Sequence, residues 1–555
     1  MNSLNAEQTA VVESTAKQIL CIASAGSGKT STLVARIRHL VAAGADPSKF
    51  MVITYTNAAS KVLQQRLEPL RVGSCGTLHG FLLRLLGRHH ALVNLPERLS
   101  VIDDEQREPM VESIMADMGV KSSLKKVMPF VDDNPLTFLS ASTSKTKEGL
   151  VAREYHRRLR KAGLLDFNTI LFYGLELVSR LDAGTFGYTH LAVDEVQDSA
   201  DIDAAIYAAM PCQNKFLCGD PDQAIFAFRG GNVANILKLA RSPDWETKLL
   251  ETNYRCAEEI CIHAQTLIEK NADRFPKKTL AANPGGEIVI HRCPTPAAEM
   301  SRVAMELQKF HVEQLAESAV LCRTNRIVEE FSTFLAGVGI PVKTRKQVAM
   351  PKDWRRAKMF LTVLANPWCD VAVERYVALR DGEPAAAKLR QQAAMEMRPL
   401  HEVAGIVVDG SPLVMFTRSM AREGLSPESR SRIEAAASEL AAGWTVPDLI
   451  LALNAGEELA REEGHGCHVG TIHGFKGKEA VNVFLVGFEE GIIPSLKADT
   501  SVEEERRLAY VGFTRASGRL WISSCEARSQ SRGPNLPPGP MQAREQSRFV
   551  KEAGL

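Results

Sequence analysis

The fold of this 555-residue chain is decided by the stretch Ala23-Ser24-Ala25-Gly26-Ser27-Gly28-Lys29-Thr30. An apolar run at residues 19–23 leads into it, and a helical pattern at residues 31–41 follows. A glycine-bearing turn between a strand and a helix points backbone N–H groups and the positive end of the helix at a phosphate. Lys29 would reach the β- and γ-phosphates of a nucleotide, and Thr30 would bind Mg²⁺. The stretch therefore predicts a phosphate-binding loop.

A pair of carboxylates ends a second apolar run, Leu191-Ala192-Val193-Asp194-Glu195. A P-loop nucleoside triphosphatase needs such a strand end across from its loop, and the two motifs occur here in the required order. Asp194 would share the Mg²⁺ with Thr30, and Glu195 would polarise the attacking water. The next apolar strand ends at Gly219, and Gln223 shortly after it could sense whether a γ-phosphate is present.

Two phenylalanines and an arginine follow that glutamine directly: Phe226, Phe228 and Arg229. Either ring could belong to the core, which is where most phenylalanines lie. The other interpretation is a platform on which nucleic-acid bases stack, because every base has a π-face. The sequence leaves both interpretations open.

Apolar strand-like runs alternate with helical patterns in two blocks. The first block has its runs at residues 18–23, 50–55, 190–194 and 216–219, and the second at 287–291, 319–323, 468–472, 483–487 and 520–524. This alternation predicts an α/β protein with two parallel-sheet domains. We expect residues 1–87 and 161–248 to form the first domain, with a helical insertion at 88–160. Residues 249–372 and 464–555 would form the second, with a short helical insertion at 373–463.

The bulk composition is that of an ordinary globular protein, with 45% hydrophobic and 24% charged residues. The N-terminus lacks a secretory signal pattern and no apolar run is long enough to cross a membrane, so we expect a cytoplasmic protein. Eleven cysteines without a C-x-x-C pair argue against a zinc site or a disulfide framework. The net charge of +1 neither predicts nor excludes a nucleic-acid partner.

Together these motifs resemble the UvrD/Rep/PcrA family of superfamily 1 DNA helicases. The resemblance extends in the same order to LNAEQ at residues 4–8, TYTNAA at 54–59, GTLHGF at 76–81, LDF at 165–167, NYR at 253–255, TIHGFKGKE at 471–479, EERRLAYVGFTRA at 504–516 and SRF at 547–549. It implies that both sheets are RecA-like P-loop domains, each carrying a helical insertion subdomain. It also implies that the nucleotide is ATP, used with Mg²⁺.

The resemblance assigns roles around the nucleotide. Tyr254 would stack on adenine, which Gln8 would also contact, and Glu479 would bind the sugar. Arg255 would reach the γ-phosphate, and Arg515 would be the arginine finger. The catalytic residues implied are Lys29, Asp194, Glu195, Gln223, Arg255 and Arg515, with Thr30 and Asp194 on the metal. The nucleotide contacts implied are Gln8, residues 23–30, Ser31, Arg36, Tyr254 and Glu479.

The resemblance also implies contacts with single-stranded DNA, made by Tyr55, Thr56, Asn57, Thr77, His79, Phe226, Phe228, Arg229, Thr471 and His473. The expected activity is that of an ATP-dependent 3′–5′ DNA helicase acting on single strands and on junctions with duplex. Two alternatives stay open. One is a translocase that strips proteins from DNA with little unwinding, which the short second insertion favours. The other is an ATP-driven motor or switch that depends on a protein partner in repair, replication or defence.

Overall fold

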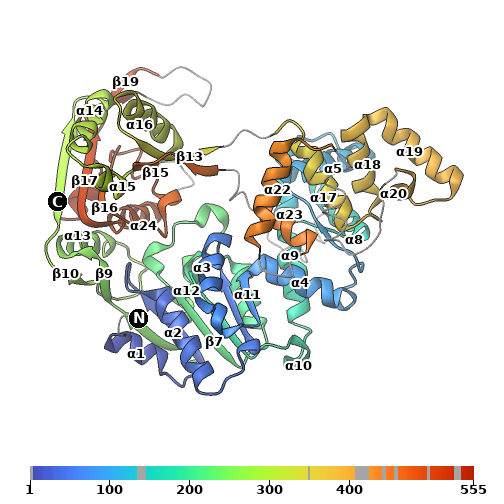
Figure 1. Ribbon diagram of the computed structural model, residues 1–555, viewed down its shortest axis with the longest axis horizontal. Helices are drawn as coiled ribbons and strands as arrows, with labels where there is room; N and C mark the ends of the chain where they lie inside the picture. The colour runs from blue at the N-terminus through green and yellow to red at the C-terminus, as the bar shows by residue number, and fades with distance from the viewer. Residues whose placement is uncertain are drawn as a thin grey trace.

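The computed structural model describes residues 4–133, 146–347, 351–404, 406, 424–440, 445–454, 460–496, 501–529 and 539–555. Two sheet domains lie side by side, and a group of helices lies beside the first of them (Figure 1). The predicted class, two parallel-sheet P-loop domains with helical insertions, is confirmed. The residue boundaries of the domains stay predictions.

The first sheet has six strands in the order β3-β2-β6-β7-β1-β8, and every neighbouring pair is parallel. Because all carboxyl ends of a parallel sheet meet at one edge, the loops after β1, β6 and β7 come together there. The strands are β1 (Gln18–Ala23), β2 (Phe50–Thr54), β3 (Ser74–Thr77), β6 (His190–Val193), β7 (Asn214–Gly219) and β8 (Glu246–Leu250).

Helices cover both faces of this sheet, as the strand sequences require. Ile19 and Cys21 of β1 pack in one hydrophobic cluster with α2, whereas Leu20 and Ile22 pack in another with α4 and α9. This period-2 alternation of two apolar faces is typical of a parallel strand buried on both sides. The helices of the domain are α1 (Ala6–Val12), α2 (Lys29–Ala42), α3 (Asn57–Leu67), α4 (Leu78–His89), α9 (Phe167–Val178), α10 (Ala183–Phe186), α11 (Asp201–Ala209) and α12 (Val233–Ala240).

The second sheet has the order β11-β17-β16-β12-β15-β13-β14, parallel except for the antiparallel pair β13–β14 at one edge. Its strands are β11 (Glu287–Cys293), β12 (Ser318–Cys322), β13 (Val342–Gln347), β14 (Ala460–Glu463), β15 (Cys467–Thr471), β16 (Ala480–Leu485) and β17 (Ala516–Cys525). Its helices are α13 (Glu258–Ile268), α14 (Pro296–Leu307), α15 (Val312–Ala316), α16 (Asn325–Gly337), α24 (Val502–Phe513) and α25 (Arg548–Glu552). Two small ladders, β9 (Thr252–Ala257) with β10 (Leu280–Asn283) and β18 (Ala527–Ser529) with β19 (Met541–Ala543), complete it.

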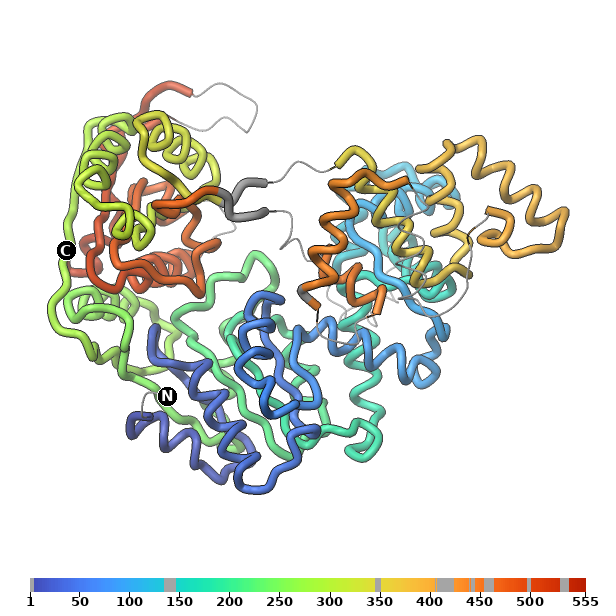
Figure 2. The backbone as a smooth tube through the Cα atoms, in the orientation of Figure 1, coloured from blue at the N-terminus to red at the C-terminus, as the bar shows by residue number. Residues whose placement is uncertain are grey.

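Two helical groups, far apart in sequence, share one core. The first group contains α5 (Asp104–Asp117), α6 (Leu124–Val131) and α8 (Lys147–Ala162), with the short strands β4 (Ser100–Val101) and β5 (Leu164–Leu165). The second contains α17 (Trp354–Ala365), α18 (Asp370–Asp381), α19 (Glu383–Glu396), α20 (Leu400–Val403), α22 (Pro427–Glu439) and α23 (Val446–Asn454). Although the second group follows β13 in the chain, it packs on the first domain's side, away from its own sheet (Figure 2).

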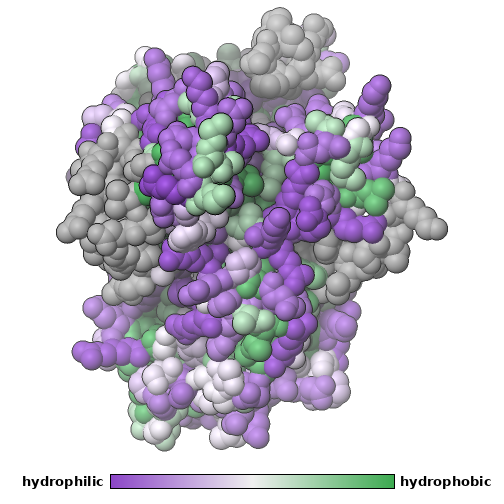
Figure 3. All heavy atoms as spheres, turned by 90° about the vertical axis from the view of Figure 1, so that its right-hand side faces the viewer, coloured by the Kyte–Doolittle hydropathy of each residue, from purple (hydrophilic) through white to green (hydrophobic). Residues whose placement is uncertain are grey.

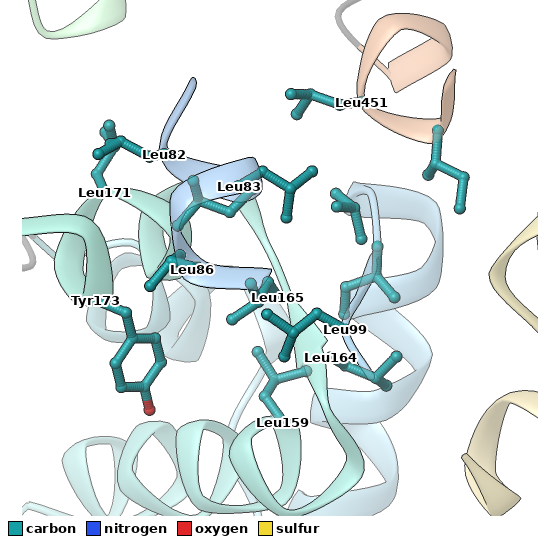
Figure 4. Packing of buried hydrophobic residues seen from close by; sticks show 14 of the residues in the cluster. Leu82, Leu83, Leu86, Leu99, Leu159, Leu164, Leu165, Leu171, Tyr173 and Leu451 are labelled. Atoms are coloured by element: carbon teal, nitrogen blue, oxygen red, sulfur yellow. The ribbon is translucent and has the colours of Figure 1, made fainter. Parts of the chain in front are cut away.

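The contact of the second helical group with α4 of the first domain and with the first helical group is apolar at its centre and polar at its margin. Leu451 of α23 faces α4, which carries Leu83, in the same hydrophobic cluster (Figure 4). At the margin, the Arg84 guanidinium lies 2.9 Å from the Asp448 carboxylate, and Lys358 pairs with Asp103. Of the helices that the structure describes, none is long and apolar enough to cross a membrane. The side of the molecule formed by these groups is mostly hydrophilic on its outside (Figure 3).

Candidate nucleotide and nucleic-acid site

The loop between β1 and α2 has the backbone that phosphate binding needs. Gly26 and Gly28 have positive φ angles of 65° and 80°, which glycine adopts without strain. Beside the loop, the Thr30 hydroxyl donates a hydrogen bond of 2.8 Å to the Asp194 carboxylate. Hydroxyl and carboxylate oxygens are the ligands that Mg²⁺ prefers, so this pair fits the metal that the motif predicts.

The two acidic residues after β6 differ in their electrostatic surroundings. Burial, together with the neighbouring charge of Glu195, raises the pKa of Asp194 to about 6. Burial alone would also raise the pKa of Glu195, but Lys29 and Lys476 outweigh it and lower that pKa. Glu195 has a positive φ of 56°, an uncommon backbone for a residue with a side chain. An ionised carboxylate held in this way is suited to polarise a water molecule.

A segment of the second domain closes against the phosphate-binding loop. The Tyr254 N–H donates a hydrogen bond of 3.0 Å to the Gly26 carbonyl. A Cβ atom on Gly26 would lie only 2.6 Å from the Cβ of Arg255, so the loop and β9 are in tight contact. The start of α1 also contacts the loop and β9: the Gln8 side-chain amide donates to the Ser27 carbonyl at 3.1 Å, and the Asn5 side-chain amide donates to the Tyr254 hydroxyl at 2.7 Å. The predicted adenine contacts Gln8 and Tyr254 thus lie at one end of the loop.

The two predicted arginines from the second domain lie close to each other. Arg255 donates to the Glu479 carboxylate at 2.5 Å, and Arg515 lies 3.4 Å from the Gln223 side-chain oxygen. Burial, followed by the charge of Arg255, lowers the pKa of Arg515 to about 9. Two cations held this close would be stabilised by an anionic group between them, which a γ-phosphate would supply.

Two predicted nucleotide contacts have other neighbours. The buried Arg36 guanidinium donates to the carbonyls of Val11, Val12 and Ser14 at 2.8–3.1 Å, which fastens α1 to α2. Ser31 is exposed on α2, where its hydroxyl lies 3.4 Å from an Arg66 nitrogen. Their contact with a nucleotide stays a prediction.

Four aromatic side chains gather where the two domains meet, and we name them the aromatic cluster: Tyr55, Phe226, Phe228 and His473. The Tyr55 and Phe226 rings are stacked with centroids 5.7 Å apart, and Phe228 meets His473 edge-on at 5.6 Å. Phe228 is 66% exposed, which is too open for a core residue. Burial, followed by three nearby cations, lowers the pKa of His473 to about 4.

Cations surround this cluster and tie it to the nucleotide site. The Arg229 guanidinium lies 5.5 Å from the Phe226 centroid and 5.6 Å from that of Phe228, and the Lys476 ammonium lies 4.9 Å from that of Phe226. Lys476 also donates to the Asp198 carboxylate at 2.7 Å and to the Gln223 carbonyl at 2.9 Å. Lys476 was not among the predicted site residues, although it stands in the motif that supplied His473.

Glu504 was also missed. This residue of α24 accepts a hydrogen bond of 3.1 Å from the Ala227 N–H, between the two phenylalanines. Because α24 ends at Phe513, two residues before Arg515, this helix connects the aromatic cluster to the predicted arginine finger. The sequence EERR indicates the helix, but it does not indicate that Glu504 contacts Ala227 of the other domain.

The remaining predicted DNA contacts lie where strands β2 and β3 of the first sheet and β15 of the second sheet end and the next helix or turn begins. The hydroxyls of Thr56 and Thr77 cap α3 and α4, and that of Thr471 accepts from the Gly474 N–H. Asn57 is the first residue of α3. The His79 ring lies 5.3 Å from that of Phe167, and burial lowers its pKa to about 4. Their contact with DNA stays a prediction.

A phosphate-binding loop with its acidic pair on one parallel sheet, and two arginines from a second sheet domain beside it, define a P-loop nucleoside triphosphatase of two RecA-like domains. Residues 4–244 match the UvrD/REP helicase N-terminal domain, and residues 249–389 and 447–527 match the UvrD-like helicase C-terminal domain. The chain belongs to the UvrD/REP helicase family and is an ATP-hydrolysing DNA helicase.

Individual relatives match over almost the whole chain. An ATP-dependent DNA helicase PcrA from Leuconostoc citreum is 27% identical, over 99% of this chain and 85% of the relative. The DNA helicase II of Escherichia coli strain K12 is 28% identical, over 95% of this chain and 85% of the relative. An ATP-dependent DNA helicase PcrA from Staphylococcus epidermidis is 27% identical, over all of this chain and 86% of the relative. The C-terminal family match skips residues 390–446, a range that includes α20 and α22 of the second helical group.

Proposed function

We propose that this helicase translocates 3′ to 5′ along single-stranded DNA and separates duplex at a junction, using ATP and Mg²⁺. The observation that carries the proposal is the aromatic cluster, which both domains build and which Lys476 connects to Gln223. Stacked, partly exposed rings flanked by cations suit successive bases and phosphates of a single strand regardless of sequence. The direction rests on the family resemblance.

Nucleotide would bind between the two domains. Thr30 and Asp194 would hold Mg²⁺, which neutralises phosphate charge and orients the phosphates when bound. Lys29 would hold the β- and γ-phosphates from the first domain, and Glu195 would orient and polarise the attacking water. Arg255 and Arg515 would approach the γ-phosphate from the second domain and stabilise the charge that develops on it during transfer.

The same bridge explains how hydrolysis would move DNA. A γ-phosphate between the two domains draws the arginines toward the phosphate-binding loop, and its loss removes the charge that held them. Tyr55, Phe226 and Phe228 belong to the first domain and His473 to the second, so closure and opening shift the two parts of the cluster relative to each other. Repeated cycles would then advance the strand.

A tailed-duplex assay tests this proposal. A short duplex with either a 3′ or a 5′ single-stranded tail is incubated with ATP and Mg²⁺, and strand separation is followed, with Lys29→Ala as the blank. We expect separation with the 3′ tail only, since a 3′–5′ motor loads there. Separation with the 5′ tail only would overturn the direction. DNA-stimulated ATP hydrolysis without separation would instead favour a translocase or a motor that needs a protein partner.

A further inference from the structure

The segment between α13 and β10, residues 271–279, contacts three elements of the nucleotide site. Asn271 donates to the Glu503 carbonyl of α24 at 3.1 Å and accepts a hydrogen bond from Arg506 of the same helix. The Ser24 hydroxyl of the phosphate-binding loop donates to the Lys278 carbonyl at 3.0 Å. The third contact, with the loop after β7, is made by charged side chains. None of residues 271–279 was predicted to take part in the site.

That third contact is a buried cluster of four charges. The Lys277 ammonium lies 2.6 Å from the Asp220 carboxylate and 3.0 Å from that of Asp222. The Arg274 guanidinium donates to both oxygens of Asp222 at 2.9–3.1 Å. The side chains of Lys277 and Asp220 are 1% and 0% exposed. Two cations and two anions thus balance each other, and of the four side chains Arg274 is the most exposed, at 10%.

Stability alone is a weak explanation for such a cluster. Removing two charges from water costs free energy that their attraction often fails to recover, and apolar residues of similar size frequently serve as well. Burial by itself lowers the pKa of Lys277, but Asp220 and Asp222 outweigh it, so the lysine stays charged. A buried charge pair that spans two domains is more readily understood if it fixes a geometry.

Asp220 supplies that geometry. One carboxylate oxygen accepts from Lys277 and also from the Asp222 N–H at 3.1 Å, and the other accepts from the Gln223 side-chain amide at 2.5 Å. Lys277 therefore sets the plane of the carboxylate that Gln223 donates to. With its N–H₂ held in this way, the Gln223 side-chain oxygen is directed to the Arg515 guanidinium, 3.4 Å away.

We propose that Lys277 is a positioning residue for ATP hydrolysis, acting through Asp220 to fix the side chain of Gln223. The proposal rests on the role of Gln223 as γ-phosphate sensor. Lys277 touches neither nucleotide nor DNA in this scheme. It joins the segment before β10 of the second domain to the sensor, so the sensor is correctly oriented only when the two domains are correctly placed.

The first test measures kcat and KM for ATP in Lys277→Met, which keeps the length of the side chain but removes its charge and donors. We expect kcat to fall about 10–100-fold, because misplacing a catalytic group by about 1 Å has effects of that size. KM for ATP should change less than about twofold, because the phosphate-binding loop is intact. Lys270→Met is the matched control, since Lys270 is exposed at the end of α13. An unchanged kcat in Lys277→Met would overturn the proposal.

A double-mutant cycle separates positioning from a general loss of structure. If Lys277 acts through Gln223, then Gln223→Ala with Lys277→Met should be no slower than Gln223→Ala alone. If the two effects on kcat multiply instead, the proposal is wrong. Lys277→Gln, which keeps a donor for Asp220, replaces Lys277→Met in both tests if the latter fails to fold in a thermal unfolding measurement. It should retain more of the wild-type kcat than Gln223→Ala does.

These outcomes are distinct from those of the tailed-duplex assay. A wild-type protein that hydrolyses ATP but separates no duplex would contradict the proposed unwinding and leave the kinetic test of Lys277 intact. A wild-type protein that hydrolyses no ATP with or without DNA would contradict both proposals.

Discussion

Phe228 is the residue whose exposure most directly suggests a ligand. This residue is 66% exposed, and its ring is in contact with Arg229 and His473. We predict that Phe228→Ala weakens binding of single-stranded DNA by about 1–3 kcal/mol, the usual effect of removing a base-stacking ring. Fluorescence anisotropy with a labelled oligonucleotide measures this. Trp368→Ala is the control, because Trp368 is also exposed but lies in the second helical group. Equal affinities of Phe228→Ala and wild type would show that the ring does not stack on bases.

His473 should act as a neutral group. Burial, followed by Arg323, Lys476 and Arg229, lowers its pKa to about 4, so it carries no proton between pH 5.5 and 8. We therefore measure how the affinity for single-stranded DNA depends on salt at pH 5.5 and at pH 8. We predict that the slope of log K against log salt is the same at these two pH values, both in wild type and in His473→Gln. A histidine that gained a proton at pH 5.5 and contacted a phosphate would steepen log K against log salt by about 0.7. Such a steepening in wild type, absent from His473→Gln, would contradict the prediction.

At the residue scale, the sequence predicted those parts of the site that lie within one motif. The loop around Gly28 and the pair Asp194–Glu195 are contiguous in the chain, so their residue types alone indicate their chemistry. Lys476 and Lys277 were missed as site residues because their partners, Asp198 and Asp220, lie on the other domain. Lysine is common on any surface, and only the fold reveals which lysines are buried against a carboxylate.

At the scale of elements, all nine predicted strands are present in the two sheets. Strands β3 and β8 were not predicted, and they are the two edges of the first sheet. An edge strand has a neighbour on one side only and is half-buried, so its sequence need not be apolar: β3 reads SCGT and β8 reads ETKLL. Strands β13 and β14 also escaped prediction, and they form the antiparallel edge of the second sheet. Hydrophobic runs therefore identify the central strands β1, β2, β6, β7, β12, β15, β16 and β17. Of the edge strands they identify only β11, whose sequence EIVIHRC is largely apolar.

The contact between the phosphate-binding loop and β9 yields a prediction for two elements at once. In Gly26→Ala the new Cβ would lie 2.6 Å from the Arg255 Cβ and 2.7 Å from the Asn253 side-chain oxygen, at a φ of 65° that alanine avoids. We predict that this variant loses most of its ATP hydrolysis, because the loop and the strand carrying Arg255 must move apart. Phosphate release measures it. Gly44→Ala is the control, since that glycine also has positive φ but has open space around it. Wild-type turnover in Gly26→Ala would show that the two elements need not touch.

At the scale of the whole molecule, the order of segments along the chain does not reveal which domain a helical group packs on. The second group is connected to the second sheet through β13 and β14, yet its buried residues share a core with α4 and the first group. Lys358 and Asn366 add polar contacts, the latter donating to the carbonyls of Arg98 and Ala162 at 3.2 and 3.1 Å. When the two sheet domains move relative to each other, we expect the second helical group to move together with the first domain and the first helical group.

This shared core predicts how local stability is distributed. Leu449 of α23 is fully buried in it, so Leu449→Ala should cost about 2–5 kcal/mol of local stability. We predict faster amide hydrogen exchange in α4 and α17 as well as in α23, because these helices pack together, and unchanged exchange in β12 and β16 of the second sheet. Leu335→Ala is the reciprocal control: Leu335 of α16 is fully buried in the second domain's core, so its loss should speed exchange there and leave α4 protected. If Leu449→Ala instead loosened α23 alone, the second helical group would be an independent unit that can leave the first domain while the motor works.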